Sequence, residues 1–264
     1  GVDRSGDVFR HANMAGTSPL GGVVAALGDD HTGESSTTLH QSELTMIDSF
    51  IPVLSPAGVQ EVMDYGLLGF ALSRFAGVWA GLKCIKDTIE VTSVVNGDPL
   101  RLQFVTPEFD MPEGGLNIRL LDTPQAQEAR IIDHKRRAVQ AFARANRMDK
   151  RVLGQAGAKI GFVAAGKNWL DLAHAMQVLG IDQQAAVRHG VTTYKVAMTW
   201  PLDIQSFSEW AEGLDCIVVV EEKRKLIESQ IKEALFNQKG SRRVFGAQDA
   251  QGALLFADSY ALDP

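Results

Sequence analysis

The sequence predicts an α/β fold, in which short apolar strands alternate with amphipathic helices. The apolar runs at 23–27 and 160–165 are bounded by turn residues and lack polar alternation, which is typical of strands buried on both faces. In the segment 168–179, apolar residues recur at helical spacing, and Gly180 follows as a stop signal. Elements that alternate in this way predict parallel sheets covered by helices.

The first region, residues 1–105, begins with a glycine-rich polar segment that leads into the strand at 23–27. A polar loop over 28–41 separates this strand from a second apolar run at 50–54. We expect Ser55-Pro56, which follow this run, to start a helix as its N-cap and first helical residue.

Helical spacing of apolar residues continues from Val59 to Ala71, and a further set from Val78 to Ile89 is spaced by four, three and four residues. We therefore expect helix through much of 59–89. The most apolar stretch, 66–82, is interrupted by polar residues and is shorter than the roughly 20 residues of a membrane span. It is predicted to be a core helix.

Residues 106–153 connect the first region to a second one at 154–264. Prolines and glycines punctuate the first half of the connection, so we expect it to be irregular, whereas 126–148 is predicted to be a charged helix. The second region is predicted to contain three strands and three helices, followed by a weakly patterned tail. The strands are expected at 160–165, 191–198 and 216–220, and the helices at 168–179, 206–212 and 221–236.

Composition limits the classes of function. The 264 residues carry a net charge of −6 with 45% hydrophobic residues, which predicts a soluble globular protein with neither a nucleic-acid nor a membrane partner. Cys84 and Cys216 are the two cysteines, each within an apolar segment. This usage favours the reducing cytoplasm and is too small for an iron–sulfur cluster, which typically takes four thiolates. Because the chain starts abruptly at Gly1, we interpret it as a piece of a longer protein.

Residues 161–168 nearly match a phosphate-binding loop. They differ from the pattern G-x-x-x-x-G-K-[ST] only at Asn168, which lacks the hydroxyl that ligates Mg²⁺. The residues between Gly161 and Gly166 are Phe-Val-Ala-Ala, which belong to the predicted strand and not to a loop whose amides could face phosphate. We prefer a strand, a tight glycine turn and a helix start, and keep a nucleotide-binding protein as a weaker alternative.

A cluster of acidic residues and histidines follows the first strand. Its members could ligate zinc or iron: Asp29, Asp30, His31, Glu34, His40 and Glu43. Their spacing matches no metal motif and the residues between the histidines are poor ligands, so we predict a hydrogen-bonded loop and no metal site. A loop beyond the carboxyl end of a strand is nevertheless where ligands usually bind in open α/β sheets. It is the best local candidate for contact with a cofactor or substrate.

Motifs along nearly the whole chain resemble the fused indolepyruvate ferredoxin oxidoreductases of bacteria. They are GVDRSGDVF (1–9), HAN (11–13), AGTSP (15–19), GDDH (28–31), SSTT (35–38), HQSE (40–43), IPVL (51–54), VQE (59–61), DYG (64–66), SRF (73–75), GVW (77–79), QFVTP (103–107), AFARANR (141–147), YKV (194–196), WPL (200–202), VEEKR (220–224) and IE (227–228).

The resemblance implies an enzyme that oxidatively decarboxylates aryl 2-oxo acids to acyl-coenzyme A and passes the electrons to ferredoxin. Its cofactors would be thiamine diphosphate, Mg²⁺ and [4Fe-4S] clusters, with the ligands of the metal and the clusters outside this chain. Region 1–105 would be the later part of the pyrimidine-binding domain, 106–153 a linker with a helix, and 154–264 a transketolase C-terminal-like domain plus tail. Alone, the chain would be inactive. Its partners would be the rest of the enzyme, with a homo-oligomer expected.

The resemblance also suggests site residues. Arg4 and His31 are predicted to donate hydrogen bonds to substrate oxygens, because both lie in loops that resemble cofactor-side loops of the family. Four further residues are predicted to line the cofactor: Asp3, Ser35, Ser36 and His40. Glu221 and Glu222, at the end of a strand, are expected to stabilise a helix start through its dipole. The alternative to an enzyme fragment is a non-catalytic scaffold or interaction module.

Overall fold

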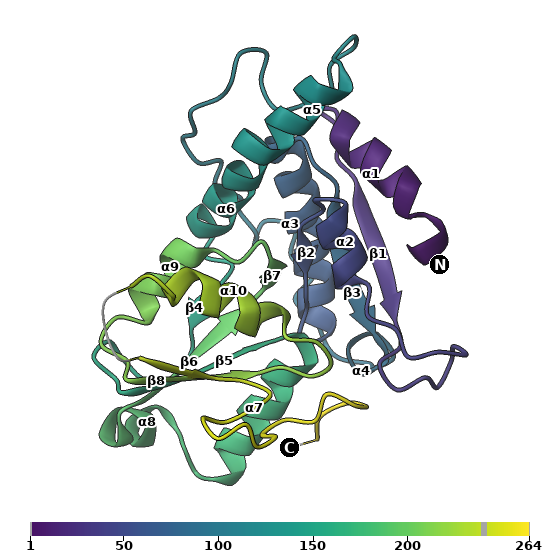
Figure 1. The fold of residues 1–264 in the computed structure, drawn as a ribbon. Coiled ribbons are helices and arrows are strands. Elements are labelled where there is room, and N and C mark those ends of the chain that lie inside the picture. Colours follow the sequence, from purple (N-terminus) through teal and green to yellow (C-terminus); the bar gives the residue numbers. More distant parts are fainter. Residues whose placement is uncertain (1, 239–241, 264) are drawn as a thin grey trace.

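The computed structural model describes residues 2–238 and 242–263, which form two sheets that lie side by side (Figure 1). Within this part of the chain, the first sheet has the strand order β1-β3-β2-β7 and the second has the order β4-β6-β5-β8-β9. Both sheets are largely parallel and are covered by helices, so the predicted α/β class is confirmed.

In the first sheet, β3 (Ala80–Ile85) lies between β1 (Val24–Asp29) and β2 (Val53–Leu54), parallel to both. The edge strand β7 (Met198–Trp200) is antiparallel to β2. A strand from the later part of the sequence therefore completes the earlier sheet, a pairing that the pattern of the sequence did not predict.

Helices bury both faces of this sheet. The long α3 (Val59–Ala76) packs on β3 and on α6 (Arg136–Ala145) around a core that includes Leu54, Leu72 and Phe142. A smaller core on the side of α1 (Gly6–Ala15) and α2 (Glu43–Asp48) contains Leu27 and Met46.

The expectation of helix through 78–89 is wrong for most of that segment. α3 ends at Ala76 because Gly77 takes a left-handed conformation, with φ of 66°, and closes the helix. The chain then forms β3, followed only by the short helix α4 (Lys86–Ile89). A short apolar run fits helical and strand spacing alike, so periodicity alone could not decide. The start of α3 was also predicted too early, since its N-cap is Gly58 and not Ser55.

The connecting region is irregular up to α5 (Pro124–Arg130), whose N-cap Thr123 accepts a hydrogen bond from the Ala126 amide. A π-helical segment (Ile131–Lys135) joins α5 directly to α6, which ends at Ala145. The predicted charged helix at 126–148 is thus confirmed, with slightly different ends and a π-helical centre.

In the second sheet, β5 (Ile160–Ala165) lies between the parallel strands β6 (Val191–Val196) and β8 (Cys216–Val220). The edges are β4 (Lys150–Arg151), which is antiparallel to β6, and β9 (Arg243–Phe245), which is parallel to β8. The expected single strand at 191–198 is divided, because Ala197 separates β6 from β7 and the two belong to different sheets.

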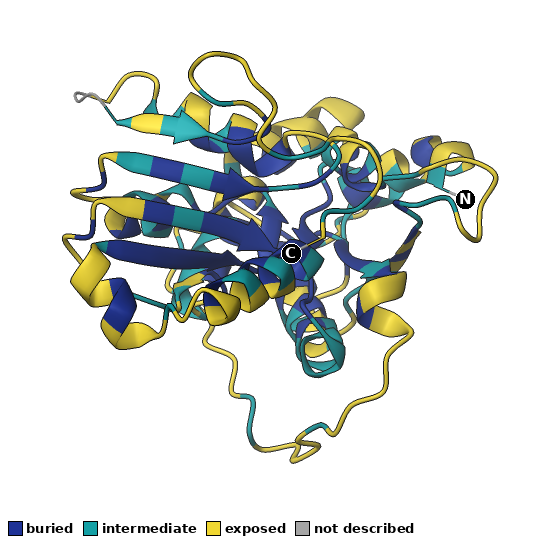
Figure 2. Cartoon of the chain, turned by 90° about the horizontal axis from the view of Figure 1, so that it is seen from below, coloured by how far each residue is buried: buried dark blue, intermediate teal, exposed yellow. Residues whose placement is uncertain are grey.

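Helices α9 (Ile204–Trp210) and α10 (Leu226–Leu235) cover one face of the second sheet, and α7 (Gly166–Val178) and α8 (Gln183–His189) lie on the other (Figure 1). Phe207 belongs to the core on the α9 side and Trp169 to the core on the α7 side. Buried residues concentrate in the strands, whereas loops and outer helix faces are exposed (Figure 2). No helix in the described residues has the length and hydropathy to cross a membrane.

Candidate functional site

Polar residues from the two sheets meet where β1 and β8 end. His31 follows β1 by two residues, is only 7% exposed, and donates a hydrogen bond through Nδ1 to the carboxylate of Glu222. Glu222 follows β8 by two residues and is 4% exposed. In open α/β sheets, the carboxyl ends of strands are where ligands bind, so this junction is the natural place for a site.

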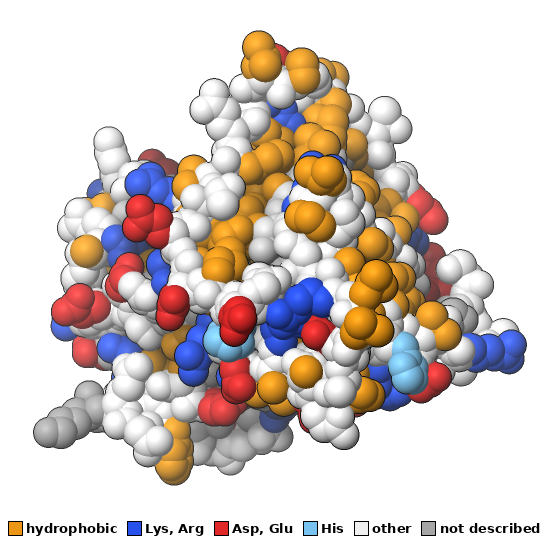
Figure 3. Space-filling view, turned by 90° about the horizontal axis from the view of Figure 1, so that it is seen from above, with side chains coloured by type: hydrophobic (Ala, Val, Ile, Leu, Met, Phe, Trp, Pro, Cys, Tyr) orange, Lys and Arg blue, Asp and Glu red, His pale blue; other side chains and the backbone are white. Residues whose placement is uncertain are grey.

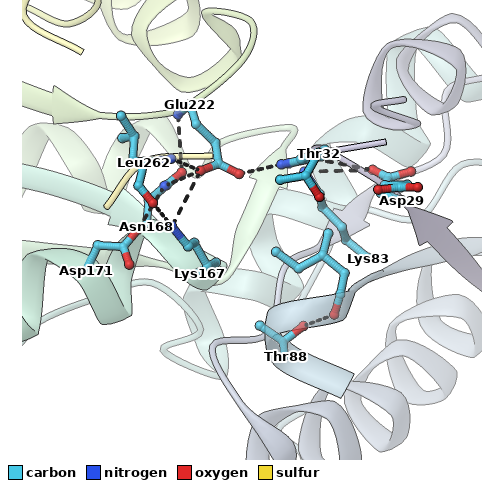
Figure 4. Close-up of polar contacts among 12 residues, drawn as sticks. Asp29, Thr32, Lys83, Thr88, Lys167, Asn168, Asp171, Glu222 and Leu262 are labelled. Carbon is cyan, nitrogen blue, oxygen red and sulfur yellow. Dashed lines mark hydrogen bonds and ion pairs between the residues drawn. The ribbon is translucent and has the colours of Figure 1, made fainter. Parts of the chain in front are cut away.

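Glu222 joins several segments. Its carboxylate accepts hydrogen bonds from Asn168 Nδ2 at 3.0 Å and from the Leu262 amide at 2.9 Å, and Lys167 Nζ lies 3.9 Å away (Figure 4). Burial alone raises the pKa of Glu222, but the bonds from His31, Leu262 and Asn168 and the charge of His31 outweigh it and lower the pKa to about 2. Glu222 is therefore an anion that ties β1, α7 and the C-terminal tail together.

A second charged group lies on the β1 and β3 side of the junction. Asp29, the last residue of β1, accepts a hydrogen bond from the Ser42 amide at 3.0 Å. Lys83 of β3 lies 3.8 Å from Asp29 Oδ2 and forms a close ion pair with Glu43. Burial favours neutral lysine, but the charges of Glu43 and Asp29 prevail and raise the pKa of Lys83. A buried cation thus links two buried carboxylates.

The loop after His31 is organised around Asp30. The Asp30 carboxylate accepts hydrogen bonds from the amides of Gly33, Glu34, Ser35 and Ser36, at 2.7–3.1 Å, and from both serine hydroxyls. These bonds hold the pKa of Asp30 far below its usual range. The loop is therefore fixed by its own carboxylate, although Asp30 itself is solvent-accessible.

Two adjoining hollows of about 480 and 450 Å³ lie beside this loop, and Asp3 and His40 line both of them. The larger one is lined by residues with hydroxyl groups, including Ser36, and by the apolar residues Phe9 and Leu27. The smaller one is lined on its far side by residues of the C-terminal region: Lys223, Arg224, Asp258 and Ser259. Together the two hollows form a cleft between the N-terminal and C-terminal parts of the chain, which we call the junction cleft.

The structure brings three of the six predicted site residues together. Asp3, Ser36 and His40 line the junction cleft, with His40 Nε2 3.6 Å from Asp3 Oδ1. His40 Nδ1 also lies 3.4 Å from Asp29 Oδ1, so the ring is held between two carboxylates.

The other three lie around the cleft without lining it in the described part of the chain. Arg4 is exposed next to Asp3, Ser35 is bonded to Asp30, and His31 is buried against Glu222.

Sequence reasoning missed Lys83, Lys223 and Arg224. Lys83 carried a signal, because a charged residue in an otherwise apolar strand must find a buried partner. Lys223 and Arg224 follow the end of β8, a position that favours ligand contact in a parallel sheet. Glu221 does stabilise a helix start as expected: its carboxylate accepts the Ile227 amide at 2.8 Å. The same expectation is wrong for Glu222, whose carboxylate binds His31, Asn168 and Leu262 instead. The helix begins at Leu226, however, later than predicted.

The near-match to a phosphate-binding loop is a strand and a turn, as preferred. Residues 160–165 form β5, and Gly166 starts α7 with φ of 52°. Lys167 is engaged by protein groups, the Leu262 carbonyl and Asp171 at 2.9 Å. The amides that a phosphate would need are thus bonded within a sheet.

The structure is that of an α/β protein with two largely parallel sheets and a candidate site at the ends of their strands. A solved 2-oxoglutarate:ferredoxin oxidoreductase from Magnetococcus marinus has a similar fold, with a TM-score of 0.56 at 12% identity over 91% of this chain and 48% of that chain.

The sequence comparisons find similarity to indolepyruvate oxidoreductases. Residues 150–264 match the indolepyruvate oxidoreductase domain family. Subunit IorA of indolepyruvate oxidoreductase from Pyrococcus abyssi is 24% identical over 247 residues, which is 90% of this chain and 36% of the relative. The subunit from Methanothermobacter marburgensis is 22% identical over 232 residues, which is 88% of this chain and 35% of the relative. The resemblance inferred from the motifs is confirmed, and the chain spans about a third of the length of these relatives.

Proposed function

We propose that this chain supplies one wall of the active site of a larger enzyme that oxidises 2-oxo acids, with indolepyruvate or a related aryl 2-oxo acid as substrate and ferredoxin as electron acceptor. The observation that carries the proposal is the junction cleft, where Asp3 and His40 line both hollows, Ser36 lines the larger one, and Lys223 and Arg224 line the smaller one. The relatives named indolepyruvate oxidoreductase support it. So does the fold shared with a 2-oxoglutarate:ferredoxin oxidoreductase, whose structure holds 2-oxoglutarate and coenzyme A.

The larger hollow suits one side of thiamine diphosphate. Phe9 and Leu27 offer an apolar wall for a flat ring, while Asp3, Ser36 and Ser42 offer polar groups at its edge. When bound, thiamine diphosphate supplies the electron sink that 2-oxo acid decarboxylation requires. We propose that the ligands for its Mg²⁺, and those for [4Fe-4S] clusters, belong to polypeptide outside this chain, as does the coenzyme A site.

We assign the substrate carboxylate to Lys223 and Arg224 in the smaller hollow, whose lining also contains the carboxylates of Asp3 and Asp258, so the pairing depends on direct contact with the two cations and not on a net positive charge. Lys223 has a φ of 63°, a conformation that costs about 1–2 kcal/mol in a residue other than glycine. Such a cost is retained where the surroundings enforce it, often at functional sites. Burial also lowers the pKa of Lys223, because it disfavours the charged form, and an anion bound beside the ammonium would stabilise that form again.

The histidines take different parts in this proposal. His40 lies in the cleft between Asp29 and Asp3 and can hold a proton on its ring for donation to a 2-oxo oxygen. His31 acts as a positioning residue through Glu222, because its Nδ1 is already engaged there. Arg4 stays a candidate donor at the rim, next to Asp3, and Ser35 holds the loop through Asp30.

Further polypeptide would complete and cover the site. Exposed apolar side chains include Leu20, Leu120 and Leu121, and hydrophobic side chains form a broad band on the face shown in Figure 3. Contiguous apolar surface of this kind is typical of contacts with other protein. We propose that the rest of the enzyme, in a cytoplasmic homo-oligomer, packs there.

The test is substitution of the cationic pair in the full-length enzyme. Arg224→Ala combined with Lys223→Ala should lower kcat/KM for indolepyruvate by about 10- to 100-fold, mainly through KM, because a charge-assisted contact contributes about 1.5–3 kcal/mol. Lys225→Ala is the matched control, since Lys225 is exposed next to the pair and does not line the cleft. Unchanged kinetics in the double variant would refute the assignment and favour a scaffold role for this chain.

A further inference from the structure

One face of the second sheet is thinly covered. On the α7 side, one long helix and the short α8 face the strands, and the C-terminal segment runs below the sheet beside α7 (Figure 1). Phe256 and Leu262 of this segment pack against the core around Trp169 and Leu172. A hollow of about 380 Å³ is left between β5, α7 and the C-terminal segment. We call it the α7 pocket.

The described residues that line the α7 pocket are apolar except for two carboxylates. Phe162, Met176 and Phe256 are among the apolar ones, and Asp171 and Asp263 are the polar ones. Lys167 lies 2.9 Å from Asp171 and partly neutralises it. Among the described residues, the Asp263 side chain has no hydrogen bond or ion pair. The pocket therefore combines an apolar interior with an acidic rim.

The wall formed by the C-terminal segment is held in place by backbone bonds. The Leu262 amide donates to Glu222 at 2.9 Å, and its carbonyl accepts a bond from Lys167. A pocket whose wall is tied to a buried carboxylate and a lysine is pre-formed, so a ligand does not need to order the segment on binding.

We propose that the α7 pocket binds an uncharged or cationic aromatic molecule of one or two fused rings. Its volume lies in the range of small-molecule sites, about 300–1,000 Å³, which are mostly apolar with a few placed polar groups. An anion would lose its hydration in an apolar interior and meet two carboxylates at the rim, so anionic ligands are disfavoured.

This site is distinct from the junction cleft. The α7 pocket shares no lining residue with either hollow of that cleft, and its ligand has the opposite charge preference to a 2-oxo acid. The inference does not depend on the proposed catalytic function, because binding at the α7 pocket is measured without turnover.

Three naphthalene probes of similar size test the proposal by calorimetry and fluorescence titration on the purified protein. They are 2-naphthylmethylamine, which is cationic at neutral pH, uncharged 2-naphthol, and anionic 2-naphthoate. We expect the amine and the naphthol to bind and the naphthoate to bind at least about tenfold more weakly, a difference of about 1.4 kcal/mol. Equal binding of all three, or no binding, would overturn the proposal.

Substitutions on α7 locate the binding. Ala175→Phe fills the pocket and should abolish amine binding, whereas Ala173→Phe places the same ring on the same helix outside the pocket and should not. If the Ala175→Phe variant does not fold, Leu179→Lys replaces it as the test. Leu179 lines the pocket but is 71% exposed, so a lysine there should not disturb folding. A lysine there should weaken amine binding and strengthen naphthoate binding.

Two substitutions in the C-terminal segment test the role of the acidic rim in charge preference. Asp263→Asn should reduce the preference for the amine, while Asp258→Asn, which lies in the junction cleft, should leave it unchanged. If no probe binds and Ala175→Phe instead dissociates a dimer in sedimentation experiments, the α7 pocket is a subunit contact and the proposal is wrong.

Discussion

Glu222→Gln should destabilise the protein strongly, although it changes only one charge. The carboxylate is buried at the junction of the two sheets and accepts hydrogen bonds from His31, Asn168 and the Leu262 amide. Glutamine retains one acceptor oxygen but turns an NH₂ group towards these donors. At least one donor then stays buried without a partner, which costs about 1–3 kcal/mol for a neutral group and more for a charged one.

The pKa of Glu222 gives a second value for the stability that its ionised carboxylate contributes. Lowering the pKa of Glu222 from 4.5 to about 2 corresponds to about 3 kcal/mol, at about 1.36 kcal/mol for each pH unit. Because the pKa of this carboxyl is lower in the folded state, its contribution to stability is present above about pH 4.5 and is lost as the pH falls towards 2. The pKa shift thus gives a cost of about 3 kcal/mol at pH 7, at the upper end of the range of about 1–3 kcal/mol for a neutral donor left unpaired.

Chemical denaturation at pH 7 and at pH 3 measures this cost. We expect the difference in unfolding free energy between the wild type and Glu222→Gln to be large at pH 7 and to shrink at pH 3. Glu212→Gln is the control, because Glu212 is exposed and should change stability by less than about 0.5 kcal/mol. If Glu222→Gln behaves like Glu212→Gln at pH 7, the junction does not depend on this carboxylate.

Two further substitutions test the elements that build the site. Gly77→Ala should destabilise the protein by more than about 2 kcal/mol, because the new Cβ would lie 2.1 Å from the Leu116 carbonyl oxygen at a φ of 66°. Gly97→Ala is the control in thermal unfolding, because Gly97 has open space around it. Equal losses of stability in the two variants would refute the argument that Gly77 is required at this turn. Lys83→Met should cost about 3–5 kcal/mol by leaving Glu43 and Asp29 without their buried cation, whereas Lys86→Met, in an exposed pair with Glu34, should cost at most about 1 kcal/mol. A loss of similar size in both lysine variants would contradict the buried network.

The parallel strands could be predicted from sequence because they are buried on both faces. β5 and β8 appear as uninterrupted apolar runs, and β8 was predicted with its observed ends. The end of α7 was marked by Gly180, which has a positive φ of 67°. In each case a local property of the chain, burial or a turn residue, was sufficient.

The errors have a common physical origin in tertiary structure. β3 follows a helix of similar apolar composition; Gly77 closes that helix, but the strand conformation of the segment after it depends on pairing with β1 and β2. β7 lies in the first sheet because it pairs with β2, a strand far earlier in the sequence. The spacing of apolar residues along the chain gives no information about either of these strand pairings.

The candidate site was predictable as a location but not as a set of partners. The loop at 28–41 was selected because it follows a strand, and it does lie beside the junction cleft. The pairing of His31 with Glu222, however, joins residues 191 positions apart. Because of this pairing, His31 does not line the cleft, whereas Lys223 and Arg224, which follow Glu222, do. No sequence motif relates these two residues to the loop at 28–41.

The most direct test of the central claim is a structure of the full-length enzyme with thiamine diphosphate and an unreactive aryl 2-oxo acid analogue. We expect the cofactor ring against Phe9 and Leu27, and the analogue's carboxylate within hydrogen-bonding distance of Lys223 or Arg224. Density for both molecules at a location remote from Asp3 and His40 would contradict the assignment of the junction cleft.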